Sequence, residues 1–325
     1  GGWEQFVIKT IEAPVKGVKK VLVIAGCDRR GTAYGVFTLS EAMGVSPLYW
    51  WADVPVKKKS QLYVESVNYI SQAPSVQYRG IFINDEGWGI TPWAGKTFDK
   101  ELGDIGPKTY AKVCELILRM KGNVLAPAMH PSSGAFNKYP ENKLVADSYG
   151  IIMSSSHCEP LLFNNVTEWD KKTMGEWNYM TNKEGINKIL DQRVSENAPY
   201  ENIYTIAMRG IHDSGLVGVP KDKEVSLVEE VIADQRSILK KHIDASLDSI
   251  PQIFVPYKEV LDIYERGLRL PEDIMLVWPD DNFGYIKRLN NEEEKKRKGG
   301  SGVYYHISYL GEPHDYLWLN TTPPA

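Results

Sequence analysis

The feature that most constrains this chain is a repeat of short apolar runs separated by polar, helix-like segments. The eight runs are YRGIFI (78–83), NVLAPAM (123–129), GIIMSS (150–155), NIYTIAM (202–208), QIFVPY (252–257), DIMLVW (273–278), GVYYHIS (302–308) and YLWLN (316–320). Near-continuous apolar runs, in place of strict alternation, are typical of parallel strands that are covered on both faces.

The segments between the runs carry the periodicity of amphipathic helices. One has apolar residues at Val113, Leu116, Ile117 and Met120, and another nearly repeats the pattern at Val228, Val231, Ile232, Gln235 and Leu239. Eight strand–helix units within about 250 residues predict a (β/α)₈ TIM barrel, which we place at residues 71–325. A doubly wound open sheet is the alternative, because the last two runs have the shortest connection and leave the count open there.

Residues 1–70 predict a small, partial N-terminal α/β domain. The run VLVIA (21–25) predicts a short buried strand, and residues 33–43 predict a helix. The turn between them, GCDRRGTAYG, lacks both the GxGxxG spacing and the lysine of a phosphate loop. We therefore interpret it as a strand-to-helix turn and not as a nucleotide site.

Composition excludes several classes of function. The net charge is −4 and basic residues are scattered, so no basic face favours nucleic acid as a partner. Three cysteines are too few for a disulfide framework or a cysteine-rich metal site. No apolar stretch reaches the roughly 18 residues needed to span a bilayer. The sequence opens at GGWEQF without a signal peptide and is expected to be a piece of a longer protein.

Polar side chains follow successive runs at the end where a barrel places its active site. Each alone has a simple explanation, since loops are polar, but their shared placement predicts one pocket. The candidates are Asp85 and Glu86 after the first run, His157 and Glu159 after the third, Arg209, His212 and Asp213 after the fourth, Lys258 and Glu259 after the fifth, Asp280 and Asn282 after the sixth, and His306 in the seventh.

Three chemistries could use such a ring of residues. Metal-dependent hydrolysis is disfavoured because no HxH pair follows the first run and no HExxH occurs. Nucleophilic catalysis lacks a GxSxG motif, and Cys158 directly follows His157, which on a strand turns the two side chains apart. Paired carboxylates fit best, because glycosidic hydrolysis needs one protonated and one ionised carboxyl group.

Two basic residues in the ring indicate the kind of sugar. Arg209 and Lys258 would be costly in a pocket for a neutral sugar, but they suit a substrate with its own carboxylate. Arginine offers the planar fork that binds a carboxylate through two bonds. The residues therefore predict a glycoside hydrolase for a polysaccharide decorated with uronic acid.

At these positions the chain resembles the α-glucuronidases of glycoside hydrolase family 115. The similar stretches are DRRGTAYGVFTLSEAMGVSPLYWWADVP, YRGIFINDEGWG, MRGIHDSG, FVPYKEV, WPDDNFGYI and GVYYHISYLGEPHDYLW. The resemblance implies an N-terminal α/β domain followed by a barrel. It also implies removal of α-1,2-linked (4-O-methyl-)glucuronic acid from glucuronoxylan with inversion, no metal or other cofactor, a secreted or periplasmic location, and homodimers in some members.

The resemblance also implies roles for single residues. Glu259 in YKEV resembles the general acid, and Asp213 in RGIHD the base, with Asp280 and Asp85 as competitors for the second role. Arg209 resembles the arginine that binds the uronate. Pocket-lining positions are implied for Asn282, His306, Lys258 and His157.

One position departs from the family pattern. The second run ends in APAMH, so His130 stands where a tryptophan-rich ending is expected, which leaves the sugar contacts there open. A second hypothesis also stays open: a carbohydrate-binding relative that keeps the uronate pocket but has no turnover.

Overall fold

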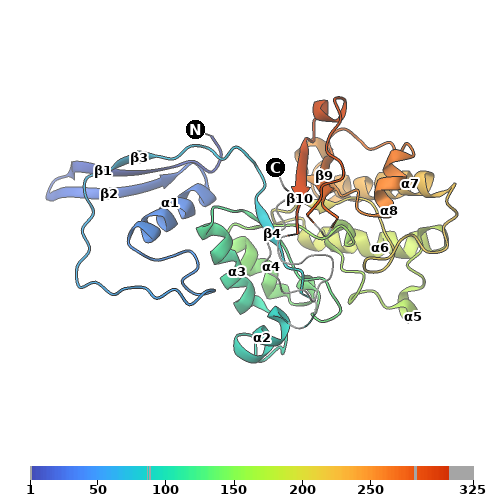
Figure 1. The fold of residues 1–325 in the computed structure, drawn as a ribbon, viewed down its shortest axis with the longest axis horizontal. Helices are drawn as coiled ribbons and strands as arrows, with labels where there is room; N and C mark the ends of the chain where they lie inside the picture. The colour runs from blue at the N-terminus through green and yellow to red at the C-terminus, as the bar shows by residue number, and fades with distance from the viewer. Residues whose placement is uncertain (1, 86, 88, 282–283, 307–325) are drawn as a thin grey trace. The chain divides into compact units, whose positions relative to one another are not determined.

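The computed structural model describes residues 2–85, 87, 89–281 and 284–306. Its strands are β1 (Phe6–Val15), β2 (Val18–Gly26), β3 (Asn68–Ile70), β4 (Gly80–Phe82), β5 (Val124–Ala126), β6 (Ile152–Met153), β7 (Tyr204–Thr205), β8 (Gln252–Phe254), β9 (Met275–Pro279) and β10 (Ser301–Tyr304). Its helices are α1 (Arg29–Ala42), α2 (Ile90–Thr97), α3 (Pro107–Arg119), α4 (Pro140–Ser148), α5 (Lys171–Met174), α6 (Tyr179–Asn197), α7 (Glu224–His242) and α8 (Glu259–Glu265). Figure 1 shows them in order along the chain.

The chain divides into two compact units. One contains residues 1–81, 107–125 and 144–152, and the other contains residues 82–106, 126–143 and 153–325. The first unit therefore takes in two segments that follow residue 81 in the sequence, as well as the N-terminal hairpin and its helix.

An antiparallel sheet and one helix form the start of the first unit. The strands lie in the order β2-β1-β3, and α1 packs on both β1 and β2. The Asp28 carboxylate accepts the Gly31 N–H at 2.8 Å and caps α1. Side chains at Gly31 and Gly35 would collide with the Gln5 carbonyl and with Ile24. The glycines of this turn thus serve helix packing, which confirms the strand-to-helix interpretation.

The predicted buried strand at residues 21–25 is only partly correct. It lies within β2, but all nine residues of β2 are exposed or half-buried. The reason is that β2 is the edge strand of a hairpin whose helix α1 covers one face, so only alternate side chains turn inward. The partner strand β1 was not identified from the sequence.

Seven of the predicted apolar runs contain β4 to β10, to within one residue at the ends of β9 and β10, and the eighth, residues 316–320, lies outside the described residues. The hydrogen-bonded order is β4-β5-β6 in one sheet and β10-β9-β8-β7 in another, and the pairs from β7 to β10 are parallel. A parallel bridge between Met153 and Asn202 links β6 to the start of β7. Strands β4 to β10 that follow one another in the sequence thus lie next to one another in space. The order of these strands does not reverse, as it does in a doubly wound sheet.

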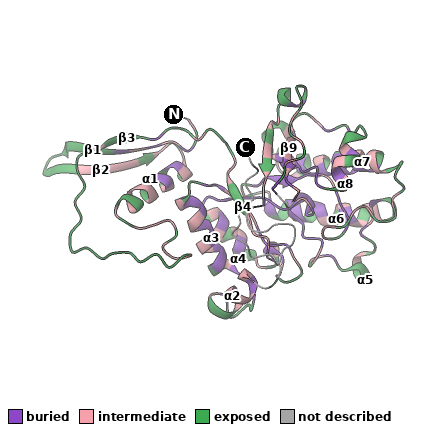
Figure 2. Cartoon of the chain, viewed as in Figure 1, coloured by how far each residue is buried: buried purple, intermediate pink, exposed green. Residues whose placement is uncertain are grey.

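The large core of the second unit lies between its helices and strands β7 to β9. The predicted apolar face of α7 is buried as expected, at Val228, Val231, Ile232, Gln235 and Leu239. These residues share a core with α6, α8 and the strand residues Phe254, Leu276 and Trp278. Figure 2 shows the buried faces of these helices. The core fixes the strands, and therefore the loops that leave their carboxyl ends.

A buried ionic cluster holds together the first unit. The Glu4 carboxylate accepts hydrogen bonds from Arg30 at 2.7 Å, from Asn123 at 2.8 Å and from Arg79. The Glu4 side chain is 2% exposed, so its charge depends on these donors. Removing one partner of a buried ion pair leaves the other charge uncompensated, which is costly.

We expect Glu4→Gln to lower the free energy of unfolding by up to about 3–5 kcal/mol. The matched control is Glu12→Gln, because Glu12 pairs with Lys20 and both side chains are more than half exposed. Such surface pairs contribute about 0–1 kcal/mol. Urea unfolding of the two variants measures the difference, and equal losses would contradict the role given to Glu4.

Candidate active site

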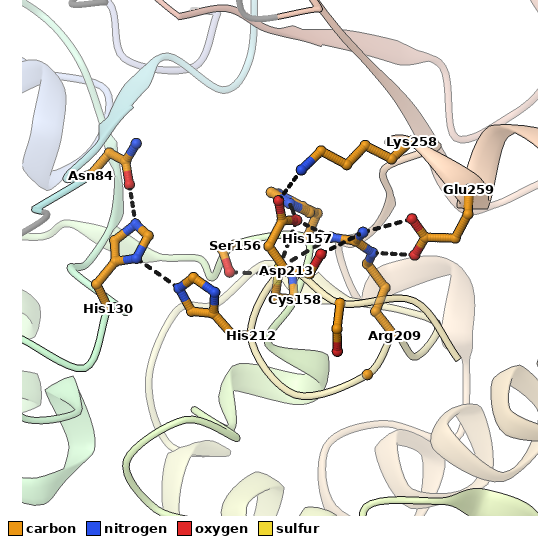
Figure 3. Close-up of polar contacts among 12 residues, drawn as sticks. Asn84, His130, Ser156, His157, Cys158, Arg209, His212, Asp213, Lys258 and Glu259 are labelled. Carbon is orange, nitrogen blue, oxygen red and sulfur yellow. Dashed lines mark hydrogen bonds and ion pairs between the residues drawn. The ribbon is translucent and has the colours of Figure 1, made fainter. Parts of the chain in front are cut away.

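The predicted residues lie where the parallel strands end. His157 follows β6, Arg209 follows β7, and Lys258 and Glu259 follow β8. Further along, Asp280 follows β9 and His306 follows β10. Because the strands are parallel and neighbouring, their carboxyl ends meet at one edge, and the loops bring several of these side chains into contact (Figure 3).

A single buried guanidinium group joins the two carboxylates that were predicted to be catalytic. Arg209 Nε and Nη2 donate to the two Glu259 oxygens at 2.7 Å each, and Nη1 donates to Asp213. The Arg209 side chain is 2% exposed, whereas those of Asp213 and Glu259 are 30% and 33% exposed. Both carboxylates therefore reach solvent from a common buried cation.

Asp213 is the centre of the network. It also accepts from Lys258 and from His157 Nε2, the latter at 3.1 Å. Burial alone would raise its pKa, but the hydrogen bonds from His157, Lys258 and Arg209 outweigh burial and hold the pKa of Asp213 well below its usual range. Asp213 is thus ionised and a weak proton acceptor.

The backbone is strained next to both carboxylates. His212, which precedes Asp213, has φ 57°, and Lys258, which precedes Glu259, has φ 50°. Residues other than glycine rarely adopt a positive φ, and such residues often occur at functional sites. Each sharp turn helps to direct the following carboxylate toward Arg209.

A second buried pair borders the site. The Asp280 carboxylate accepts from the His306 backbone N–H at 3.3 Å and interacts with His306 Nδ1. The ring of Tyr304 lies 4.8 Å from that of His306 and 6.1 Å from that of His157. The Asp280–His306 pair therefore connects to the Arg209 network through the ring of Tyr304.

Two predicted site residues serve local turns. The Asp85 carboxylate accepts from the Thr91 N–H at 3.3 Å and from the Thr91 hydroxyl in the first turn of α2. The Glu159 carboxylate accepts the Ser156 N–H at 3.0 Å, and burial raises the pKa of Glu159 to about 7. Neither carboxylate is bonded to Arg209, Asp213 or Glu259 in the described residues. Glu86 and Asn282 lie outside the described residues.

Two histidines and one asparagine form a hydrogen-bonded chain beside this network. His212 Nε2 lies 2.7 Å from His130 Nδ1, and His130 Nε2 contacts the Asn84 amide oxygen. Burial, with the charge of His212, lowers the pKa of His130 to about 4. Asn84 and His130 were absent from the predicted site, although their places after the first two runs are the same signal that identified the others.

Cys158 was not predicted to join the site, since neighbouring residues on a strand point apart. In the structure residues 157 and 158 lie in a turn, and both side chains contact Asp213, with Cys158 Sγ at 3.7 Å. Burial raises the pKa of Cys158 to about 12, so the thiol is not an activated nucleophile.

His157, Cys158 and Asp213 are also close enough to hold a metal ion, with ligand atoms within 4.8 Å of one another. The group fits a divalent cation poorly. Its thiol is protonated, and Arg209 and Lys258 already neutralise its carboxylate. A further cation would be repelled by both.

Comparison with known proteins identifies the family of the chain. The profile of Glycosyl hydrolase family 115 matches residues 71–325. The chain belongs to this family. A solved structure described as a family GH115 4-O-methyl-α-glucuronidase, BtGH115A, with specificity for decorated arabinogalactans, is 43% identical, with a TM-score of 0.89 over 98% of this chain. The present chain covers 42% of that protein's length.

Two further findings are negative. A search of curated proteins finds no match to the chain. Within the residues that the structure describes, no helix is long and apolar enough to cross a bilayer. The profile match and the solved relative confirm the family predicted from the sequence.

We expect the three thiols to differ sharply in reactivity. Cys27 is exposed, whereas Cys114 and Cys158 are buried and burial raises the pKa of each to about 12. Iodoacetamide at mildly alkaline pH should modify Cys27 and spare the other two until urea unfolds the protein. Peptide mass spectrometry measures the labelling, and rapid modification of Cys158 in the folded protein would overturn its assignment as an inert thiol.

Proposed function

We propose that this chain is the catalytic part of an α-glucuronidase that removes α-1,2-linked glucuronic acid, or its 4-O-methyl ether, from a polysaccharide with inversion. The observation that carries the proposal is the buried Arg209, which holds Glu259 and Asp213 together beside Lys258. This pairs two carboxylates, as glycosidic hydrolysis requires, with the cations that an acidic sugar needs. The activity of the family GH115 relative supports it.

In this mechanism Glu259 is the general acid. Its proton passes to the glycosidic oxygen as the bond from that oxygen to C1 breaks, and a water held on the Asp213 side forms the new bond to C1. The second proton of the reaction leaves this water. Inversion requires the acid and the base to stand about 6.5–9.5 Å apart, which leaves room for the water.

Arg209 links recognition of the uronate to the position of the acid. Glu259 uses both of its oxygens on the Arg209 fork. A uronate that binds Arg209 and Lys258 competes with Glu259 for these donors. A neutral sugar would leave the Arg209–Glu259 ion pair intact.

We propose that residues 71–325 form a closed (β/α)₈ barrel, with residues 1–70 as part of an N-terminal domain. The consecutive strand order supports closure. So does the contact between the rings of Phe82, at the end of β4, and Tyr304, at the end of β10, whose centroids lie 5.9 Å apart. The predicted eighth strand would complete the ring.

The polysaccharide has two candidates. Glucuronoxylan follows from the resemblance in the sequence, and decorated arabinogalactan is the substrate class named for the relative. Release of uronic acid from the two polymers in parallel decides between them. Either polymer is too large to cross a membrane, which supports a secreted or periplasmic location.

We expect Glu259→Gln to lower turnover by about 10²–10⁴-fold, the usual contribution of a general acid. The assay is release of free uronic acid by the full-length protein. Glu265→Gln is the matched control, because Glu265 ends the same helix α8 and its side chain is 55% exposed. A Glu259 variant with the rate of the control would remove Glu259 from the mechanism, and polymer binding without turnover in the unmodified protein would favour a binding relative.

A further inference from the structure

The oxygens of Asp213 are already occupied by donors. Oδ1 accepts from Arg209, from His157 at 3.1 Å and from the Cys158 thiol at 3.7 Å, while Oδ2 accepts from Lys258. An ionised carboxylate offers about four lone-pair sites, so little capacity is left for a water. The same donors that hold Asp213 in place make it a poor acceptor for the proton that the attacking water must lose.

His157 offers the acceptor that Asp213 lacks. Its Nε2 faces Asp213 Oδ1, and a carboxylate that is already ionised can only accept, so neutral His157 carries its proton on Nε2. Its Nδ1 then holds a lone pair. No described residue forms a hydrogen bond with Nδ1 of His157. Among the described residues, this nitrogen is also not one of the side-chain atoms that are both fully buried and without a hydrogen-bond partner. A water can therefore reach it.

The surroundings of His157 keep the ring oriented and neutral. The ring of Tyr257 lies 4.4 Å from it, and that of Tyr304 lies 6.1 Å away. Burial lowers the pKa of His157 below its ordinary value, opposed by the hydrogen bond to Asp213 and reinforced by Arg209. The titratable and charged groups that act on the ring are Asp213, Arg209, His306, His130, Tyr257 and Tyr304.

We propose that His157 is the general base, which takes the proton of the attacking water at Nδ1, and that Asp213 is its positioning residue. The inference rests on the proposed hydrolysis. The water oxygen bonds to C1 as its proton moves to Nδ1, and the bond from C1 to the glycosidic oxygen breaks as that oxygen receives the proton of Glu259. The imidazolium is stabilised by Asp213 and returns its proton to solvent, while Glu259 regains one.

The decisive variant is His157→Gln, because the glutamine amide can still donate to Asp213 but offers no basic nitrogen. We expect its kcat to fall by about 10²–10⁴-fold with little change in KM. Asp213→Asn should cause a similar loss, since an asparagine that donates to Nε2 forces the proton onto Nδ1. The double variant should be no slower than the worse single variant, because the two act as one unit.

Two readouts separate this role from a structural one. The acid limb of kcat/KM in the unmodified enzyme should lie below the ordinary histidine value of 6.5, because burial lowers the pKa of His157. The ¹⁵N NMR signals of His157 should show a proton on Nε2 and none on Nδ1. Neither measurement depends on whether a variant folds, and the NMR measurement also stands if the chain releases no uronic acid.

A His157→Gln variant that folds and keeps more than about a tenth of the wild-type kcat, well short of the loss of a general base, would overturn the proposal in favour of Asp213 as the base. A proton found on Nδ1 would overturn it too. Loss of turnover in Glu259→Gln together with retained turnover in His157→Gln would leave the hydrolase function intact and reject only the role of His157.

Discussion

The buried positive charge of Arg209 is the constraint around which the site is built. An isolated charge at that depth would cost several kcal/mol, so the fold must supply partners for it. Those partners are Asp213, four residues further along the same loop, and Glu259, which begins helix α8 after the next strand. Two carboxylates that would otherwise repel each other are thereby held on either side of one cation.

This arrangement makes the two carboxylates unequal. Asp213 accepts hydrogen bonds from four donors and is firmly ionised, whereas Glu259 is bonded to Arg209 alone among the contacts described. A ligand that competes for Arg209 therefore takes away the described hydrogen-bond partner of Glu259, whereas Asp213 keeps three others. Unequal partners of this kind suit the separate roles proposed for the two carboxylates, in which Glu259 donates a proton and Asp213 positions His157.

The fold was largely predictable because burial on both faces leaves a simple signature. Strands β4 to β10 lie within the predicted runs, to within one residue, since parallel strands under helices need apolar side chains on both sides. The hairpin strand β1 was harder to identify. It faces α1 on one side and is exposed on the other, and residues 6–12 therefore mix apolar and charged residues.

The site was predictable in position but not in detail. The rule that loops after parallel strands converge brought Arg209, Asp213 and Glu259 together, and it applied equally to Asp85 and Glu159. These two bond instead to backbone groups within six residues, and only the local path of the loop decides between such a cap and the pocket. The contact between Cys158 and Asp213 likewise depends on a turn that the sequence pattern does not predict.

The positive φ of His212 and Lys258 has a consequence for how this site can vary. At Lys258 the angles, φ 50° and ψ −121°, lie outside the left-handed helical region, and only glycine adopts them readily. A randomised library at this codon should be dominated by glycine among its folded members, whatever the screen demands of the side chain. Anyone redesigning the specificity of this pocket would do better to begin at neighbouring positions with ordinary backbone angles, where all twenty choices stay open.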